Sequence, residues 1–360
     1  MKKNRKPVRV LIVDDSASVR QILARELGRD PEIEIVGTAG DPYIARDKIL
    51  SEKPDVLTLD IEMPRMDGLT FLRKLMTYYP MPVIVLSSLA ASGTQVALDA
   101  LEYGAVDIFA KPSCDMQNGL AVSMQRLTQA VKAAGRVRVK SAAPRVAHEP
   151  VVVKSASPSV LHTTDKVIAI GASTGGTEAL KKVLTRMPPD CPAILIVIHM
   201  PEGFTSRYAE RLNSICDIEV REAADGDWLH AGMALVARGD NQLILTRSGA
   251  RYRVRVQKGP AVCQHCPSVE VLFQSAAKAA GPNAMGVIMT GMGADGANGL
   301  LKMRQAGAYT VAQNEESCVV FGMPKEAIEL GGAVDVLPLD EISGACTRWS
   351  HTGATLARSL

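Results

Sequence analysis

The sequence predicts two α/β domains joined by a linker. Short apolar runs alternate with segments of helical spacing from Val8 to about Ala134, and a second such series begins at Val167. Between them, residues 136–164 carry Ala, Ser, Pro, Lys and Val without a stable period, which is typical of a linker. We therefore expect a first domain at 7–130, a linker at 131–164 and a second domain at 165–350.

The first domain is predicted to contain a parallel sheet. Residues such as Val19, Ile22, Leu23 and Leu27 have the spacing of an amphipathic helix between two apolar runs. The apolar runs that we expect to form buried strands are Val8–Val13, Ile33–Val36, Val56–Leu59, Val83–Leu86 and Asp107–Ala110. Five strands that alternate with five helices indicate a five-stranded, parallel, doubly wound α/β sheet.

The second domain has the same rhythm. We expect strands near Val167–Gly171, Ile194–His199 and Ala284–Thr290, with helices between them. Residues 234–256 suggest shorter strands, for which an antiparallel arrangement is open. The prediction is a doubly wound α/β domain with a mostly parallel sheet.

Composition excludes several classes of protein. With 360 residues, 47% hydrophobic and 22% charged, the chain has a globular balance, and its net charge of +3 is too small to indicate nucleic acid or an anionic membrane surface. Its longest apolar runs are shorter than the ~20 residues that cross a bilayer. The basic N-terminus leads directly to Asp14 and Asp15, so a signal peptide is not expected. We expect a soluble, cytoplasmic monomer without membrane insertion.

The cysteines do not predict a disulfide framework, because there are seven of them and they are scattered. Cys263 and Cys266 form a C-x-x-C motif around His265. A zinc site would need two more ligands at suitable spacing, and the sequence has no second C-x-x-C or H-x-x-x-H. We favour a loop with reduced thiols.

Polar residues mark the carboxyl ends of strands in the first domain, where parallel sheets gather functional groups. They are Asp14 and Asp15 after the first strand, Asp60 after the third, Ser87 after the fourth and Lys111 after the fifth. Three converging carboxylates repel one another unless a cation lies among them, and oxygen ligands of this type suit Mg²⁺. Each residue alone could be a helix cap or a solubilising loop residue, but the joint pattern favours a phosphoryl-transfer site.

These segments resemble the receiver domains of two-component response regulators, which have a flavodoxin-like fold. The resemblance covers about the first 130 residues and rests on Val10–Asp15, LTLDIEMPRMDG at 57–68, VIVLSS at 83–88 and FAKP at 109–112. It implies that Asp60 is the phosphoacceptor. It also implies that Asp15, Asp60 and the carbonyl of Glu62 bind Mg²⁺, that Asp14 supports the ion through water, and that Ser87 and Lys111 couple phosphorylation to a conformational shift.

A second site is expected where Ser173 lies in the Gly-rich turn GASTGG, between a strand and a helix. A serine at such a turn is held out of the sheet near the positive end of the helix dipole. The same kind of turn can also bind phosphate or a dinucleotide. The motif alone leaves the nucleophile and the anion site as alternatives, although it is neither G-x-G-x-x-G nor a P-loop.

Two further strand ends favour the nucleophile. His199 ends the next strand and Asp295 lies in the loop after the strand Ala284–Thr290. Ser173, His199 and Asp295 thus form a set of nucleophile, general base and orienting carboxylate at one sheet edge. His265 remains a competing base. The ordinary α/β-hydrolase interpretation is rejected, because there the histidine follows the acid along the chain.

The second domain resembles the protein-glutamate methylesterases of chemotaxis, a family that joins a receiver to a catalytic domain. The motifs are IGASTGG at 170–176, HMPEGFT at 199–205, PSVEVLF at 267–273 and MTGMGADGANG at 289–299. The resemblance implies catalytic Ser173, His199 and Asp295, with oxyanion stabilisation near Met292 and Thr174. The sequence departs from the family at Cys263–Cys266 and at Arg238-Gly239-Asp240.

The resemblance implies hydrolysis of glutamate γ-methyl esters on methyl-accepting chemotaxis receptors, deamidation of receptor glutamines, and a chemotaxis histidine kinase as phosphodonor. Mg²⁺ would serve receiver phosphorylation, and ester hydrolysis would need no cofactor. We expect the unphosphorylated receiver to cover Ser173. One alternative is a DNA-binding output domain, but a helix-turn-helix pattern and a basic stripe are missing from the sequence. The other is an adaptor with an inactive serine site.

Overall fold

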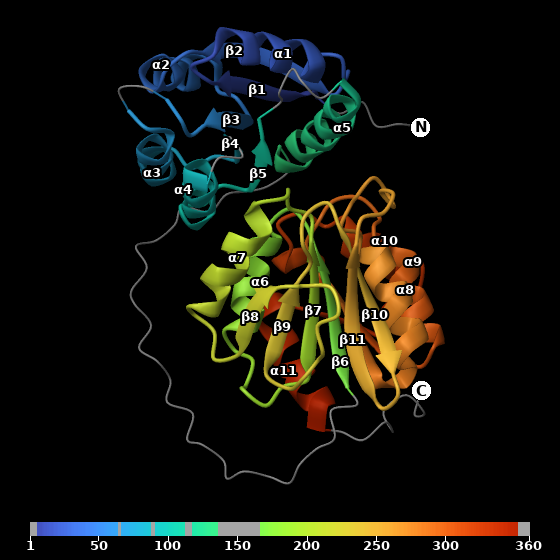
Figure 1. Ribbon diagram of the computed structural model, residues 1–360. Coiled ribbons are helices and arrows are strands. Elements are labelled where there is room, and N and C mark those ends of the chain that lie inside the picture. Colours follow the sequence, from blue (N-terminus) through green and yellow to red (C-terminus); the bar gives the residue numbers. More distant parts are fainter. Residues whose placement is uncertain (1–5, 64–65, 88–90, 112–116, 136–165, 352–360) are drawn as a thin grey trace.

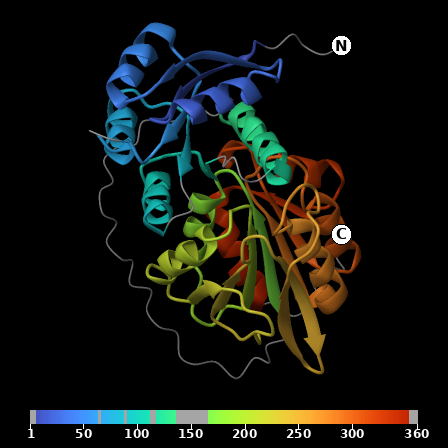
Figure 2. The same cartoon turned by 45° about the horizontal axis from the view of Figure 1, so that its top comes forward.

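The computed structural model describes residues 6–63, 66–87, 91–111, 117–135 and 166–351. Two α/β domains lie against each other, and the first one covers one end of the second (Figures 1 and 2). The linker at 136–164 and the tail from 352 fall outside the described residues. In the described part, no helix combines the length and apolar character that a membrane span requires.

The first domain is the expected parallel sheet, in the order β2-β1-β3-β4-β5. Its strands are β1 (Val8–Val13), β2 (Ile33–Ala39), β3 (Val56–Asp60), β4 (Val83–Ser87) and β5 (Asp107–Ala110). Its helices are α1 (Ala17–Leu27), α2 (Pro42–Glu52), α3 (Gly68–Tyr78), α4 (Ala91–Glu102) and α5 (Gln117–Ala134). Helices α1 and α5 pack on one face, while α2, α3 and α4 pack on the other. The sheet is therefore doubly wound, as predicted.

Helix α5 continues past residue 130, where the sequence placed the start of the linker. Val131, Ala133 and Ala134 are buried, and Val131 and Ala134 pack beside Leu27 of α1. Burying these apolar side chains stabilises the last turn of α5, so the domain's ordered structure extends to residue 135. Residues 131–134 thus belong to the helix.

The second domain contains a seven-stranded sheet in the order β14-β13-β12-β6-β7-β9-β8, and each of its strand pairs is parallel. Its strands are β6 (Val167–Ala172), β7 (Ala193–Ile198), β8 (Glu219–Glu222), β9 (Met233–Val236), β12 (Ala284–Ile288), β13 (Tyr309–Gln313) and β14 (Asp335–Leu337). Its α-helices are α6 (Gly176–Leu184), α7 (Phe204–Asn213), α8 (Val269–Ala280), α9 (Ala297–Gln305), α10 (Met323–Glu329) and α11 (Leu339–His351). Helices α6, α7 and α11 cover one face, and α8, α9 and α10 cover the other. The predicted mostly parallel, doubly wound sheet is confirmed.

The segment 234–256 contains both kinds of pairing. Strand β9 joins the main sheet parallel to β7, whereas β10 (Gln242–Ser248) and β11 (Arg251–Gln257) form a separate antiparallel hairpin. Leu243, Leu245 and Val254 of the hairpin are buried, so one face of the hairpin packs on the domain. An antiparallel arrangement is thus correct for β10 and β11 and wrong for β9.

Strand order brings three loops together. Strand β6 lies between β12 and β7. The chain continues from β6 to β7 on one side and later adds β12 on the other side of β6. Parallel α/β sheets bind ligands at such a switch point, outside the carboxyl ends of the strands. Ser173, His199 and Asp295 follow β6, β7 and β12, respectively.

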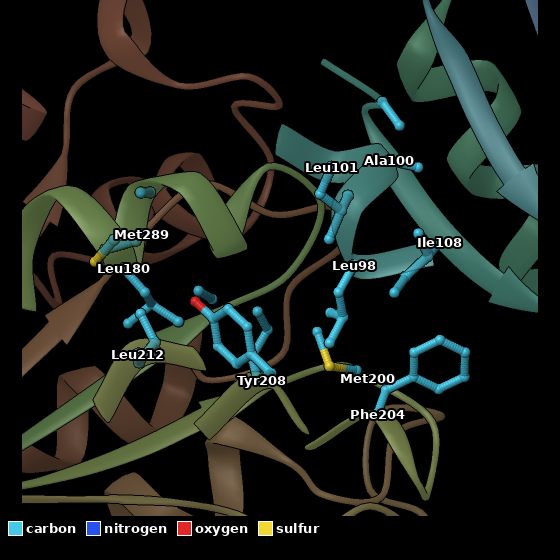
Figure 3. Packing of buried hydrophobic residues seen from close by; sticks show 14 of the residues in the cluster. Leu98, Ala100, Leu101, Ile108, Leu180, Met200, Phe204, Tyr208, Leu212 and Met289 are labelled. Carbon is cyan, nitrogen blue, oxygen red and sulfur yellow. The ribbon is translucent and has the colours of Figure 1, made fainter. Parts of the chain in front are cut away.

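The first domain packs on this edge of the second sheet. Leu98 and Leu101 of α4 and Ile108 of β5 belong to the same buried cluster as Met200, Phe204, Tyr208 and Leu212 from the second domain (Figure 3). Around this apolar contact, Arg211 pairs with Asp99 at 2.7 Å and with Glu102 at 2.5 Å, and Lys181 pairs with Glu102 at 3.1 Å. An apolar centre with a charged rim is the usual anatomy of a protein interface.

Candidate functional site

Ser173 lies in a tight turn between β6 and α6. Its backbone N–H donates to the Thr290 carbonyl at 3.0 Å, and its own carbonyl accepts from Gly176 at 2.6 Å. Gly175 has φ 77, which favours glycine, and it is the N-cap of α6. A Cβ on Gly291 would lie 2.8 Å from the Ser173 Cβ, so a larger residue at 291 would displace the serine. The turn therefore fixes the position of Ser173.

Asp295 is held by several donors at the N-terminus of α8. His199 Nε2 donates to Oδ2 at 2.8 Å, and both side chains are 1% exposed. The Ser268 hydroxyl donates to Oδ1 at 2.7 Å, and the backbone N–H groups of Val269 and Glu270 donate at 2.8 and 3.0 Å. Burial pushes the pKa of Asp295 up, but the hydrogen bonds from His199, Ser268 and Val269 outweigh it and lower the pKa. Asp295 therefore stays ionised.

The arrangement gives the two nitrogens of His199 different roles. Because Nε2 faces Asp295, Nδ1 is the nitrogen that is free to accept a proton, and it is buried without a hydrogen-bond partner among the described residues. Burial lowers the pKa of His199, although the hydrogen bond to Asp295 acts in the opposite direction. His199 and Ser173 line the same cavity. A neutral imidazole beside a serine is suited to general-base catalysis.

This cavity of about 260 Å³ lies between the two domains. The second domain contributes Ser173, Thr174, His199, 263–265 and 292–294, and the first contributes Asp107, Phe109, Arg126, Gln129 and Ala130. Thr174, the residue after the serine, donates through Oγ1 to Asp107 Oδ2 at 2.6 Å. Burial raises the pKa of Asp107 to about 6, although the Thr174 hydrogen bond lowers it. The first domain thus reaches the turn that carries Ser173.

Two backbone groups near the serine have the features of an oxyanion site. Thr174 and Met292 both line the cavity. Neither of their N–H groups donates to any other residue in the part of the chain that the structure describes. A pair of unengaged donors beside a nucleophile can stabilise a developing oxyanion.

The carboxylates of the first domain also converge. Asp14, Asp15 and Asp60 place oxygen atoms within 4.8 Å of one another. Lys111 Nζ lies 2.7 Å from Asp60 Oδ2 and 3.7 Å from Asp14 Oδ2. Asp14 Oδ2 is buried and has no hydrogen-bond partner among the described residues. An oxygen-lined cluster with such an acceptor fits the ligand preference of Mg²⁺.

Burial dominates the electrostatics of this cluster. It raises the pKa of Asp60 to about 6, against the hydrogen bonds from Lys111 and Glu62. It raises the pKa of Asp14 as well. Burial alone would lower the pKa of Lys111, but the hydrogen bond and charge of Asp60 raise it. The site therefore contains more buried carboxylate than one lysine can balance.

The other predicted residues lie around Asp60. The Glu62 N–H donates to Asp60 Oδ1 at 2.9 Å. Ser87 is buried at the end of β4, and its carbonyl accepts from the Lys111 N–H at 2.9 Å. Strand order thus brings all the residues predicted for this site to one edge of the first sheet.

Sequence reasoning missed three contacts. Ser268 binds Asp295, Asp107 binds Thr174, and the ring of His265 stacks on that of His199. Ser268 lies within the PSVEVLF motif, whose spacing alone did not indicate a role for the serine. Asp107 carries no sequence signal, because its contact depends on how the domains pack.

Comparison with known proteins gives two family models. Residues 168–346 match CheB methylesterase, and residues 10–122 match the response regulator receiver domain. A protein-glutamate methylesterase/protein-glutamine glutaminase of group 3 operon from Rhodopseudomonas palustris is 52% identical over 353 residues, covering 96% of each chain. The chain belongs to the CheB methylesterase family. The family resemblance of its receiver and catalytic motifs is thus confirmed.

Other relatives agree with this family assignment. Protein-glutamate methylesterase/protein-glutamine glutaminase 5 from Anaeromyxobacter dehalogenans is 55% identical over 344 residues, covering 94% of this chain and 95% of the relative. The crystal structure of the Thermotoga maritima CheB methylesterase catalytic domain matches with a TM-score of 0.50 and 36% identity, covering 51% of this chain and 98% of that one. The family's catalytic domain thus corresponds to the second domain of this chain.

Proposed function

We propose that this chain is a phosphorylation-activated serine hydrolase that removes methyl groups from glutamate γ-methyl esters of methyl-accepting chemotaxis receptors and deamidates receptor glutamines. The observation that carries the proposal is the buried His199–Asp295 pair, whose His199 lines the same cavity as Ser173 in a CheB methylesterase. Residues 7–130 would regulate, and residues 165–350 would catalyse. The enzyme would act in the cytoplasm as a monomer and bind no nucleic acid.

The reaction begins with acylation. The Ser173 hydroxyl attacks the ester carbonyl while His199 Nδ1 takes its proton. Asp295 holds the ring through Nε2 and stabilises the imidazolium that forms. The tetrahedral intermediate then breaks its bond to methoxide, which receives the proton from His199 and leaves as methanol. A glutamine side chain would lose ammonia by the same route.

Deacylation repeats the chemistry with water. His199 Nδ1 takes a proton from water as the water attacks the acyl-enzyme. The tetrahedral intermediate then breaks its bond to Ser173 Oγ, which receives that proton from His199, and the glutamic acid released ionises to a carboxylate. The N–H groups of Thr174 and Met292 would donate to the oxyanion in both steps, with an effect of about 10²–10³-fold per donor. The chain's own side chains supply all proton transfers, so the ester hydrolysis is proposed to need no cofactor.

The receiver site would control this chemistry. Asp60 is proposed as the phosphoacceptor, with Asp15, Asp60 and the Glu62 carbonyl as Mg²⁺ ligands and Asp14 as support. The unsatisfied, buried Asp14 oxygen and the converging carboxylates fit this ion. A bound Mg²⁺ would neutralise the charge of the acceptor and of the phosphoryl oxygens. Lys111 and Ser87 would contact the phosphoryl group, which a chemotaxis histidine kinase would donate.

Strand β5 supports a physical route between the two sites. Asp107, at its start, contacts Thr174, and Lys111 directly follows its last residue and pairs with Asp60. At about 3.3 Å per residue, the two ends are about 13 Å apart. A phosphoryl group on Asp60 would break the present Lys111–Asp60 pair, shift β5 and weaken the packed interface. The unphosphorylated receiver would therefore block receptor access to Ser173, and phosphorylation would relieve the block.

Methanol release from methylated receptor membranes tests the proposal, with and without acetyl phosphate and Mg²⁺. We expect release that requires Ser173 and rises with the phosphodonor, while Ser173→Ala gives background. Asp60→Asn should keep the unstimulated rate and lose the stimulation. Release by Ser173→Ala would overturn the nucleophile assignment, and stimulation of Asp60→Asn would overturn the phosphoacceptor assignment.

A further inference from the structure

His265 is not part of the proposed triad, yet its imidazole contacts the general base. The rings of His265 and His199 are stacked, with centroids 3.5 Å apart and planes within 3°. Aromatic rings usually prefer offset or edge-to-face arrangements, with centroids about 4.5–7 Å apart. The nearly complete overlap is therefore imposed by the surrounding backbone.

The backbone that imposes it is a tight hairpin. Val262 and His265 exchange two hydrogen bonds, at 2.9 and 3.0 Å. The two residues between them, Cys263 and Gln264, have φ 50 and 70, as a type I′ turn requires. Neither is glycine, and a left-handed backbone is sterically unfavourable for residues that carry a Cβ. The turn is thus strained to place His265.

The same segment also holds the carboxylate of the triad. Three residues after His265, the Ser268 hydroxyl donates to Asp295, and the next two N–H groups donate as well. Asp295 in turn accepts from His199 Nε2. Residues 265–270 therefore position His199 in two ways. Ser268, Val269 and Glu270 hold Asp295, which binds Nε2 of His199, and His265 covers one face of the His199 ring.

We propose that His265 is a positioning residue, whose imidazole stacks on the general base His199 and fixes its ring plane, and with it the place of the unpaired Nδ1 in the cavity that Ser173 also lines. Asp295 alone leaves the His199 ring free to rotate about its hydrogen bond, because the terminal torsion of histidine is broad. The stacked ring removes this rotation and excludes water from one face of His199. The inference rests on the proposed triad.

His265 is suited to this role because it stays neutral. Burial, followed by the charges of His199 and Arg126, lowers the pKa of His265 to about 2. The charged groups that act on the stacked pair are Asp295 and Arg126. A neutral ring can stay in contact with His199 in both of its protonation states, and its π face attracts the imidazolium that forms during acylation.

The test compares His265→Ala with His265→Phe in the full chain, treated with acetyl phosphate and Mg²⁺. Alanine removes the stack, and phenylalanine keeps an aromatic face but cannot transfer a proton. With p-nitrophenyl acetate as the substrate, we expect kcat of His265→Ala to fall about 10–100-fold, as misplacement of a reacting group by about 1 Å does. KM should change little, and His265→Phe should recover most of the loss.

The pH profile separates positioning from a general effect on folding. Activity requires neutral His199, and burial lowers its pKa. Water that enters beside alanine should raise this pKa toward its usual ~6.5, so that the acid limb of kcat moves to higher pH. Phenylalanine should leave the limb in place. His230→Ala serves as the control, because this imidazole is 56% exposed and lies outside the cavity.

Two results would overturn the proposal. An unchanged rate and acid limb in His265→Ala would show that the stack is dispensable. Equal losses in the alanine and phenylalanine variants, with the acid limb unmoved, would assign His265 a proton-transfer or substrate-binding role. If His265→Ala does not fold, His265→Asn replaces it, with the same expectations. The nitrophenyl ester needs no receptor, so a failure with receptor substrates alone would contradict the proposed function and leave the positioning role testable.

Discussion

Asp60 and Asp295 are both buried carboxylates at the carboxyl edge of a parallel sheet, yet their surroundings shift their pKa values in opposite directions. Asp295 accepts hydrogen bonds from His199, Ser268, Val269 and Glu270, and its pKa is lowered. Asp60 has Lys111 and one backbone N–H, and its pKa is raised to about 6. The number of donors therefore decides whether a buried carboxylate is satisfied or needs a further cation.

The difference matches the two proposed roles. A carboxylate that orients a base must stay ionised in one position, which a full set of donors provides. A carboxylate that accepts a phosphoryl group must remain free to bind Mg²⁺ and react, so a complete set of protein donors would block it. Asp295 thus finds its donors within the protein, whereas the buried oxygen of Asp14 beside Asp60 has no donor among the described residues, as the proposed cation site requires.

The largest effect is expected from Asp295→Asn. An amide carries no charge to stabilise the His199 imidazolium. It also has one acceptor oxygen, whereas the present donors bind both carboxylate oxygens of Asp295. We expect kcat for ester hydrolysis to fall about 10³–10⁴-fold, as for other triads in which the acid becomes an amide. The measurement is p-nitrophenyl acetate hydrolysis with acetyl phosphate present.

Asp217→Asn is the matched control, since this carboxylate is exposed in the same domain. A loss of less than tenfold in Asp295→Asn, with the fold retained, would contradict the orienting role of Asp295. It would also remove the contrast between the two carboxylates.

The interface should give a smaller effect. Arg211→Gln removes ion pairs to Asp99 and Glu102 that join α7 to α4. These side chains are about a quarter to a third exposed, so we expect the substitution to destabilise the packed arrangement of the two domains by about 1 kcal/mol. That energy lowers the equilibrium constant for the closed state, in which the receiver packs over Ser173, about fivefold. The receptor demethylation rate without phosphodonor should therefore rise severalfold.

Arg186→Gln controls for the loss of a surface arginine, because Arg186 pairs with Asp340 of its own domain. Both variants should reach the same rate when acetyl phosphate is saturating. An Arg211→Gln enzyme with wild-type basal activity would indicate that these pairs do not hold the receiver over Ser173.

The sequence predicted both sites because each of their residues follows a strand that is recognisable from its apolar run. Asp60, Ser87, Ser173 and His199 lie directly at such strand ends, so periodicity and the parallel-sheet rule located these residues, while their roles rest on the family resemblance. The strand order that places β6 between β12 and β7 was not predictable from periodicity, because local patterns do not fix which strands pair.

What the sequence left open depends on packing between distant segments. The hydrogen bond to Asp295, which His199 alone of the two makes among the described residues, favours His199 over His265 as the base, and the sequence did not show it. The hydrogen bond between Thr174 and Asp107 joins the two domains, and no sequence pattern predicts which surfaces of the two domains pack together. The extension of α5 to Ala134 follows from burial against α1, which spacing alone did not show.

Asp107 should make the packing of the receiver on the catalytic domain depend on pH, and the basal rate should change a few-fold as a result. Its pKa is about 6 in the packed structure, above the usual ~3.9 of aspartate. The packed state therefore binds more protons between these values, and closure should weaken as pH rises through about 6. Asp107→Asn keeps an acceptor for Thr174 without the charge, so at pH 7.5 we expect a basal rate several times below that of the wild type.

The comparison for Asp107→Asn is the same pair of enzymes at lower pH, where the gap between their basal rates should narrow as pH falls from about 6 toward about 4. Asp47→Asn is the control, since this carboxylate is exposed in the same domain and remote from the cavity. A basal rate above wild type at pH 7.5 would show that the charge of Asp107 favours the packed state.

The last effect concerns the stability of the receiver and leaves the catalytic rate aside. Asp60 has a folded pKa of about 6, above its unfolded value, so the folded protein binds more protons between about 4 and 6 and loses stability as pH rises through this range. Asp60→Asn should therefore stabilise the receiver at pH 7.5 in EDTA by about 1–3 kcal/mol, a Tm increase of several degrees. The gain should shrink near pH 4, where wild-type Asp60 is protonated. Excess Mg²⁺ should reverse the order at pH 7.5, because it binds the wild-type carboxylates; a variant less stable than wild type in EDTA would mean that the Lys111 pair outweighs the burial of Asp60.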